Sequence, residues 1–473
     1  MRLILKISTT KINILYNSIY QLLIMIIPLL TTPYISRILG AKGIGIYSYN
    51  YSIAQYYVLF IMLGLNNYGN RTIAENRDNK LKLTKTFWSI YFFQLITGVI
   101  VLTIYILYCI FLSDNKLISV IMFVYVLSAC LDINWFYFGI ENFKFTVIRN
   151  FIIKVLTTFS IFIFVKSSED LWKYCCIMVI GIFFSQLVLW PNLRKYISFY
   201  CPSFREIKVH IKPNCILFLT VIAVSLYKIM DKIMLGLIST KVQVGYYESA
   251  ERIISVPTAF ITSIGTVMLP RMSNMIARND NRSNKIIYKS LVLACFLSTS
   301  MAFGIMGVSK EFVPYFYGPG YEICVYLFWI LLPSSIFFAF GNVIRTQYLL
   351  PHKMDKIYVK SAFLGACTNI VINLILIPKF YSIGAAIGTL FSEGIVCVYQ
   401  SIKVGKDIPI WDYTKKCIPF VLSGILMFIT LININFDYAV IVSLILKVFI
   451  GICLYFINVF LFLCFYKICK RTN

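Results

Sequence analysis

Apolar runs of about twenty residues recur along almost the whole of this 473-residue chain. Each run is long enough to cross the hydrocarbon core of a bilayer as a helix. The composition agrees, because 59% of the residues are hydrophobic and only 13% are charged. The short alternating segments of a strand barrel are not seen. We therefore predict an all-α membrane protein that crosses the bilayer many times.

The runs predict fourteen transmembrane helices. Six precede the basic loop 192–213 and eight follow it. The first span has no small-residue cleavage site after it, so we interpret it as an uncleaved helix. The predicted spans are 14–36, 46–66, 87–112, 117–139, 147–166, 170–191, 214–238, 245–269, 287–308, 323–345, 356–378, 380–402, 417–433 and 437–463.

Lysine and arginine alternate between rich and poor loops. Loops 67–86 and 192–213 hold five each, and loops 271–286 and 403–416 hold four each, whereas the intervening loops hold one or two. Cytoplasmic loops carry the excess of Lys and Arg, so both termini are predicted to face the cytoplasm. The net charge of +25 is mostly this topology signal, with some affinity for anionic lipid. The basic loops are short and separated, which argues against nucleic-acid binding.

The two sides of the basic loop look related. GIYSYNYSIA (Gly45 to Ala54) resembles GYYESAERII (Gly245 to Ile254), and a Leu-Gly pair precedes each of them. A parallel repeat of this kind predicts two six-helix lobes, 1–195 and 196–404, followed by two additional spans in 405–473. The match is short, and chance similarity between apolar helices is the alternative.

Three charged residues interrupt the seventh predicted span: Lys228, Asp231 and Lys232. We expect Lys228 to pair with Asp231 at i,i+3, which leaves Lys232 as surplus positive charge. Three central charges cost roughly 8–10 kcal/mol on the insertion scale, more than the apolar residues of the span return. The charged side should therefore face protein or a water-filled cavity. The alternative is a structural Lys228–Asp231 pair, with Lys232 reaching the outer interface.

The eighth span repeats the pattern, with Glu248, Glu251 and Arg252 on one side of the helix. The alternative places them at a solvated outer rim. Arg345 lies near a predicted cytoplasmic end, where its long side chain can reach the interface. We interpret the cations as substrate-binding residues and the acids as residues for charge balance or coupling. The candidate cations are Arg37, Lys154, Lys228, Lys232 and Arg252, and the candidate acids are Asp231, Glu248, Glu251 and Glu393.

Tyrosines crowd the start of the second span, and polar residues follow one side of the first. Tyrosine rings stack on sugars, and their hydroxyls form hydrogen bonds with them. The alternative is an aromatic belt at the membrane interface. The candidate sugar contacts are Asn17, Tyr47, Tyr51 and Tyr56.

Metal chemistry is not indicated. The chain has two histidines, His210 and His352, far apart in sequence, and its fourteen cysteines are scattered without a C-x-x-C pair. No loop offers room for a soluble catalytic domain. The remaining features predict a cavity that combines fixed positive charge with aromatic side chains. A lipid pyrophosphate that carries sugars suits such a cavity.

Several segments resemble Wzx-type oligosaccharide flippases, of the superfamily that includes lipid II flippases and MATE drug exporters. They cover nearly the whole chain in the family's order. In the most specific one, the family ends one helix and starts a tightly packed next helix at positions matching Asn373, Pro378, Gly384 and Gly388, while Tyr381 stands where relatives often have Gly. The segments are PYISRILGAKGIGIYSY (33–49), LDINWFYFGIENF (131–143), DKIMLG (231–236), VGYYESAERI (244–253), MLPRMS (268–273) and 345–393.

The resemblance implies a bacterial cytoplasmic-membrane protein that moves an undecaprenyl-pyrophosphate-linked oligosaccharide to the outer leaflet for surface polysaccharide synthesis. It implies alternating access around a central cationic cavity, coupled to a H⁺ or Na⁺ gradient, with no other cofactor and no bond chemistry. The expected partners are the lipid-linked glycan, membrane lipids, a polysaccharide polymerase and glycosyltransferases. The alternatives are a MATE-like ion-coupled exporter of small molecules and a membrane-embedded glycan polymerase or glycosyltransferase.

Overall fold

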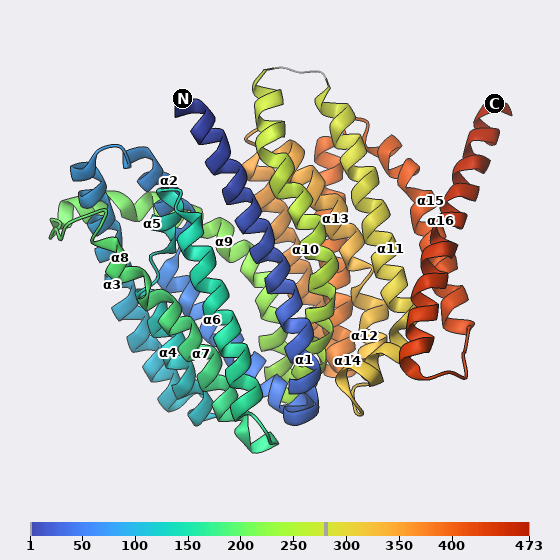
Figure 1. The fold of residues 1–473 in the computed structure, drawn as a ribbon, viewed down its shortest axis with the longest axis horizontal. Helices are drawn as coiled ribbons and strands as arrows, with labels where there is room; N and C mark the ends of the chain where they lie inside the picture. Colours follow the sequence, from blue (N-terminus) through green and yellow to red (C-terminus); the bar gives the residue numbers. More distant parts are fainter. Residues whose placement is uncertain (1, 279–281, 473) are drawn as a thin grey trace. The chain divides into compact units, whose positions relative to one another are not determined.

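The computed structural model describes the backbone of residues 2–278 and 282–472, and their side chains except for 2–26, 143, 220, 227, 463 and 465–472. This described part is helical almost throughout and contains no strand (Figure 1). Contacts divide the chain into two compact units, 1–225 and 226–473. The division falls inside one helix, α9 (Phe204–Ile238).

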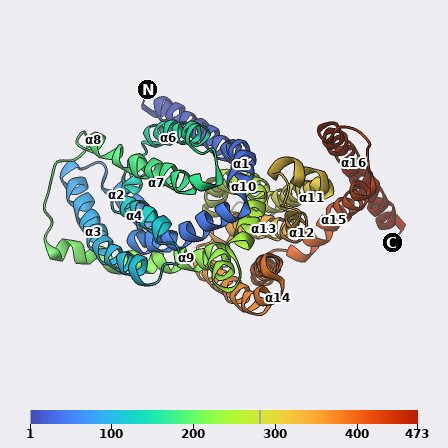
Figure 2. The same cartoon turned by 90° about the horizontal axis from the view of Figure 1, so that it is seen from below.

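The first unit begins with α1 (Arg2–Met62), and α9 leads out of it. Helix α4 packs against α1, α3 and α7, and α6 packs against α7, as Figures 1 and 2 show. Trp135 anchors the interior: its ring lies 5.3 Å from that of Phe87, and its indole nitrogen donates to Gln94 Oε1. Between α1 and α9 come α2 (Leu65–Asn76), α3 (Lys80–Phe111), α4 (Lys116–Cys130), α5 (Asn134–Gly139), α6 (Phe143–Phe164), η1 (Ser168–Asp170), α7 (Leu171–Leu187) and α8 (Leu189–Leu193).

The second unit is built around α11 (Ser283–Tyr317), which packs against α10, α12, α13, α15 and α16. A buried ion pair joins α11 to the last helix, with Lys447 Nζ 2.5 Å from Glu311 Oε1. Tyr317 is fully buried, and its hydroxyl donates to the carbonyl of Ser249 on α10. The other elements are α10 (Lys241–Ala277), α12 (Ile323–Leu331), α13 (Ser334–Ile344), the π-helix η2 (Arg345–Leu349), α14 (Asp355–Val404), α15 (Ile410–Asn433) and α16 (Val440–Thr472).

Eleven segments of the described chain are long and apolar enough to cross a membrane. Helix α14 counts once among them, although it covers two of the predicted spans and breaks at Tyr381, where φ is 51°. Helix α1 is not among the eleven, and it breaks at Gly40, where φ is 63°. The multi-pass membrane architecture is confirmed. The count of fourteen spans, the lobe boundaries and the parallel repeat stay predictions.

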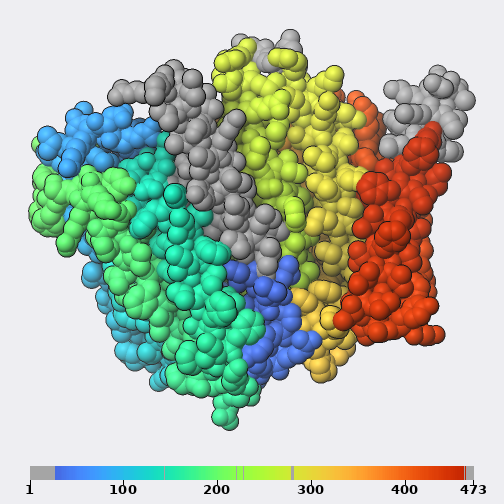
Figure 3. All heavy atoms as spheres, viewed as in Figure 1, coloured from blue at the N-terminus to red at the C-terminus, as the bar shows by residue number. Residues whose placement is uncertain are grey.

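The outer surface is apolar along the long helices. Val99 on α3, Phe159 on α6 and Phe449 on α16 each expose more than 60% of their area. Large apolar side chains gather outside because lipid tails, unlike water, do not penalise their exposure. In Figure 3 atoms of α10, α11 and α16 make up much of the visible face of the second unit.

Candidate functional site

Four charged side chains of α9 and α10 form an ion-pair network, defined here as Lys232, Glu248, Glu251 and Arg252. Lys232 Nζ lies 2.7 Å from Glu248 Oε2 and 2.7 Å from Glu251 Oε2. Arg252 Nε donates to the other oxygen of Glu248 at 2.9 Å. The Lys232 side chain is only 17% exposed. Two cations and two anions leave this network with no net charge.

The local chain geometry brings these residues together. Helix α9 ends at Ile238 and α10 begins at Lys241, so the two helices are joined by a turn of two residues. Positions 248, 251 and 252 lie three and four residues apart, which places them on one face of α10. Lys232 occupies the last part of α9, where it can reach that face. Each charge thus finds its counter-ion within one helical hairpin.

Asp231, next to Lys232 in sequence, points elsewhere. It is 1% exposed and accepts three hydrogen bonds: Tyr247 Oη and Thr389 Oγ1 donate to Oδ2 at 2.8 and 2.7 Å, and Asn373 Nδ2 donates to Oδ1 at 2.5 Å. Asn373 Nδ2 also donates to Asn369 Oδ1. We call these five residues the Asp231 cluster. No cation lies within ion-pair distance of Asp231 in the described part of the chain.

Two buried amide atoms of the Asp231 cluster, Asn373 Oδ1 and Asn369 Nδ2, have no hydrogen-bond partner. A buried polar group without a partner is costly, so each such group calls for an explanation. Carboxylate, amide and hydroxyl oxygens are the ligands that small hard cations prefer. Of the two unpaired atoms, Asn373 Oδ1 is a free acceptor and Asn369 Nδ2 is a free donor. The cluster therefore combines a buried carboxylate that lacks a counter-ion with one free acceptor oxygen, an arrangement that suits a bound cation or a proton.

Glycines let the two halves of α14 approach closely enough to build this cluster. A Cβ at Gly384 would lie 2.6 Å from the carbonyl of Leu376, and a Cβ at Gly388 would lie 2.2 Å from Asn373 Oδ1. Neither separation is possible for a real side chain. The predicted tight approach at Gly384 and Gly388 is confirmed.

The predicted pairing within α9 is wrong. Lys228 does not pair with Asp231, and Lys232 is not a surplus cation. Spacing along one helix cannot reveal partners on other helices. The partners of Lys232 lie on α10 and those of Asp231 lie on α10 and α14, and they determine how these two charges are paired. Lys228 is exposed and makes no ion pair with the side chains that the structure describes.

Glu393 lies on the second half of α14, where it is half-buried. No ion pair shorter than 4.0 Å joins Glu393 to Lys228 or Arg345 among the described side chains. Arg345 begins η2, donates to Asn342 Oδ1, and lies 5.5 Å from the centre of the Tyr358 ring.

The remaining predicted residues belong to the first unit. Tyr47 is buried, with its ring 5.6 Å from that of Tyr51, and Tyr51 stacks on Tyr125. Tyr56 donates to the carbonyl of Ser225. Tyr47 is buried, whereas Tyr51 and Tyr56 are half-buried. The two interpretations of these rings, sugar contact or interfacial belt, stay predictions. The other three lie as follows: Arg37 is exposed, Lys154 is half-buried on α6, and the Asn17 side chain lies outside the described residues.

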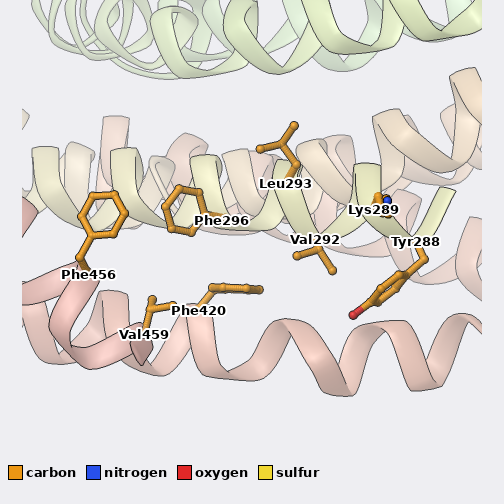
Figure 4. A pocket seen from close by; sticks show the side chains of 8 residues that line it. All are labelled: Tyr288, Lys289, Val292, Leu293, Phe296, Phe420, Phe456 and Val459. Carbon is orange, nitrogen blue, oxygen red and sulfur yellow. The ribbon is translucent and has the colours of Figure 1, made fainter. Parts of the chain in front are cut away.

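An apolar groove of about 360 Å³ opens between α11, α15 and α16 (Figure 4). Phe296, Phe420 and Phe456 line it, and Lys289 and Tyr288 supply its polar atoms at one end. This lining suits apolar groups and differs from the polar lining of the Asp231 cluster.

Comparison with known proteins identifies the family. A family model described as "Polysaccharide biosynthesis protein" matches residues 11–276, more than half of the chain. The chain belongs to the polysaccharide biosynthesis protein family. A second family model, "Lipid II flippase MurJ", matches residues 150–465. The resemblance to flippases of this superfamily is thereby confirmed.

A relative of this polysaccharide biosynthesis protein from Escherichia coli (strain K12), named as an O-antigen transporter, is 24% identical over 401 residues, which cover 82% of this chain and 96% of the relative. A solved structure of the lipid II flippase MurJ in an inward closed conformation has a TM-score of 0.78 and 17% identity, and covers 95% of this chain and 98% of the other. A solved structure of an inward-facing MATE transporter has a TM-score of 0.58 and 12% identity. This match covers 83% of this chain and 99% of the other. Both structures are similar in fold.

Sequence reasoning missed several of the polar residues that the structure brings together around these buried charges. Tyr247, Asn369 and Thr389 were not candidates, and Arg345 was interpreted as a residue that reaches the interface. A signal for two of the cluster residues was present, because Asn369 and Asn373 lie four residues apart in an otherwise apolar span. Polar residues on one face of a membrane helix mark a protein-facing side. Thr389 carries no such signal.

Proposed function

We propose that the protein is a flippase that moves an undecaprenyl-pyrophosphate-linked oligosaccharide repeat unit from the cytoplasmic to the outer leaflet for surface polysaccharide synthesis. The observation that carries the proposal is its similarity to a protein named as an O-antigen transporter over 96% of that protein's length. The buried charges of α9, α10 and α14 support it, because ionisable residues inside membrane proteins mark the pathway of a polar cargo or ion.

The site residues divide into two roles in this proposal. Lys228 contacts the pyrophosphate, since it is the exposed one of the two lysines within the predicted span 214–238. Lys232 and Arg252 are neutralised by Glu248 and Glu251, so they contact the cargo only when it displaces a carboxylate. Without the cargo, the ion-pair network then holds Lys232 and Arg252 in place. Their positive charges become available when the cargo displaces a carboxylate. Alternating exposure of the site to the two leaflets would complete the cycle.

We further propose that the Asp231 cluster binds the coupling ion, H⁺ or Na⁺. Asp231 is a buried carboxylate that lacks a counter-ion among the described side chains, and hydroxyl and amide groups surround it. Binding of a cation would remove an uncompensated buried charge, which is costly in a low dielectric. Ion occupancy would then favour one arrangement of α9, α10 and α14, which is the requirement for coupling.

Two experiments test the function. A deletion strain should lose surface polysaccharide and accumulate a lipid-linked oligosaccharide on the cytoplasmic leaflet; a strain with normal surface polysaccharide would contradict the proposal. In vesicles containing purified protein and that oligosaccharide, an imposed Na⁺ or pH gradient should accelerate transfer. Asp231→Asn should abolish the acceleration while the protein remains folded, and an unchanged response would contradict the coupling role.

The similarity of fold to a MATE transporter supports a second candidate, an ion-coupled exporter of small molecules. A deletion strain that becomes drug-sensitive but keeps intact surface polysaccharide would favour export. The higher similarity to MurJ, and the name of the Escherichia coli relative as an O-antigen transporter, favour the flippase.

A further inference from the structure

The chain that leads from α8 into α9 carries aromatic side chains on its exposed surface. Phe199 is 74% exposed, and Phe204, the first residue of α9, is 70% exposed. In Figure 2 this connection follows the outer edge of the first unit. Apolar side chains that gather on an exposed surface mark a contact with another molecule or with a membrane. The question is which of these the surface fits.

Several contacts fix this connection in place, so the exposure of its rings is built into the fold. The indole nitrogen of Trp88 on α3 donates to the carbonyl of Ser198 at 2.8 Å, and its ring centre lies 4.9 Å from that of Phe199. Glu206 Oε2 accepts from the backbone N–H of Ser203 at 2.7 Å, and the hydroxyl of Ser203 accepts from the N–H of Glu206. This reciprocal cap starts α9 at a defined residue.

The first turns of α9 separate a packed face from an exposed one. On the packed face, Ile207 is 6% exposed, and His210 Nδ1 lies 2.6 Å from Tyr68 Oη on α2. The residues of the exposed face lie within about 140° of one another on the helix and include no acid. None of its three cations forms an ion pair with the side chains that the structure describes. We call this surface the α9 basic face: Phe204, Arg205, Lys208, Val209 and Lys212.

The α9 basic face lies where the chain enters the predicted bilayer. Lys212 is followed by Pro213 and the predicted span 214–238, and Trp88, which contacts Phe199, is the second residue of the predicted span 87–112. The charge pattern predicts the cytoplasmic side for loop 192–213. Cations at this level meet lipid head groups, while apolar side chains beside them reach the boundary with the acyl chains.

We propose that the α9 basic face, together with Phe199, binds the head groups of anionic phospholipids in the cytoplasmic leaflet. Lys and Arg beside a membrane are attracted to its negative surface, and inserted apolar side chains add binding that does not depend on charge. An acidic protein would pair with the cations, but it would not account for exposed aromatic rings at the entrance to two spans. The inference does not depend on the cargo that the protein moves.

The test follows the tryptophan fluorescence of the purified full-length protein in bilayers. Lipids with bromine atoms in their acyl chains quench nearby tryptophans, and the quenching that disappears on Trp88→Phe reports this surface, because Trp88 contacts Phe199. We expect brominated phosphatidylglycerol to quench Trp88 at about a threefold lower mole fraction than brominated phosphatidylcholine. Arg205→Gln/Lys208→Gln/Lys212→Gln should lose this preference, and high salt should weaken it in the wild type.

The matched control is Lys116→Gln/Lys310→Gln/Lys379→Gln, which removes three exposed cations from loops that are predicted to face outward. It changes the net charge equally and should keep the preference. Thermal unfolding of every variant separates a lost surface from a lost fold. Equal quenching by both lipids in the wild type would overturn the inference and favour an acidic protein as the partner. A preference that persists in the folded α9 variant, or disappears in the control variant, would also overturn it.

Discussion

Two lysines one turn apart on α9 have opposite surroundings. Lys232 is enclosed by Glu248 and Glu251, whereas Lys228 is exposed. Removing one partner from a buried ion pair leaves the other charge uncompensated, which costs far more than the loss of an exposed charge. The same substitution at these positions should therefore have very different effects on stability.

Lys232→Ala is expected to lower the free energy of unfolding by about 3 kcal/mol, because two neighbouring carboxylates lose their shared cation. Lys228→Ala is the matched control and should change it by less than about 0.5 kcal/mol. Denaturant unfolding of the purified protein in detergent measures both. Equal stability of the two variants would contradict the network.

The sequence alone shows that charges interrupt the seventh and eighth spans, and it predicts that they face protein or a water-filled cavity. It did not reveal which residues pair with Asp231, because two of them are distant in the sequence. Asn373 lies 142 residues from Asp231, and Thr389 lies 158 residues from it. Helical periodicity orders residues within one helix and contains no information on which helix packs opposite. Helical periodicity therefore could not decide whether Lys228 or Lys232 is the unpaired cation.

At the scale of elements, α14 is a hairpin of two closely packed halves. The sequence predicted both halves and the role of Gly384 and Gly388, because small residues four apart let membrane helices approach. The predicted boundary falls near the observed break at Tyr381. The close approach positions Asn373 beside Asp231, so the packing of α14 and the polar cluster depend on the same contacts.

Gly388→Ala should disrupt the Asp231 cluster, since the added methyl would lie 2.2 Å from Asn373 Oδ1. We expect a loss of about 1–3 kcal/mol in the free energy of unfolding. Gly394→Ala, six residues further along the same helix, meets only Phe337 at 3.9 Å and should be neutral or slightly stabilising. Thermal unfolding of both variants decides; similar losses would contradict the argument.

Tyr381 adopts φ 51° and ψ −125°, a conformation that glycine accepts and other residues adopt only with strain. Its side chain is 49% exposed, so little packing is lost on its removal. Tyr381→Gly should raise the free energy of unfolding by about 1 kcal/mol. Tyr381→Ala keeps the strain and should bring no gain. A destabilised glycine variant would show that the ring contributes more than the backbone costs.

At the scale of the whole molecule, the charge pattern of the loops makes a prediction that the fold leaves open. The basic loop 192–213 is expected on the cytoplasmic side, and loop 434–439 on the outer side. Cys201 is exposed within the basic loop, which supplies a natural reporter of the orientation.

A membrane-impermeant maleimide should leave Cys201 unlabelled in intact cells and label it after permeabilisation. Asp437→Cys, introduced into a Cys201→Ser background, should be labelled in intact cells, because residue 437 lies in the loop between α15 and α16, for which the charge pattern predicts the outer side. Labelling of Cys201 from outside would reverse the predicted orientation of both termini.

The ion-pair hairpin also affects how the polypeptide is made. As synthesis proceeds, α9 leaves the ribosome with Lys228, Asp231 and Lys232 before α10 supplies the acids and well before α14 supplies Asn373 and Thr389. A nascent α9 therefore cannot partition into lipid by itself. We expect the insertion machinery to retain it until α10 emerges and to release the two helices together, so that biogenesis of this protein requires a waiting step in the middle of translation.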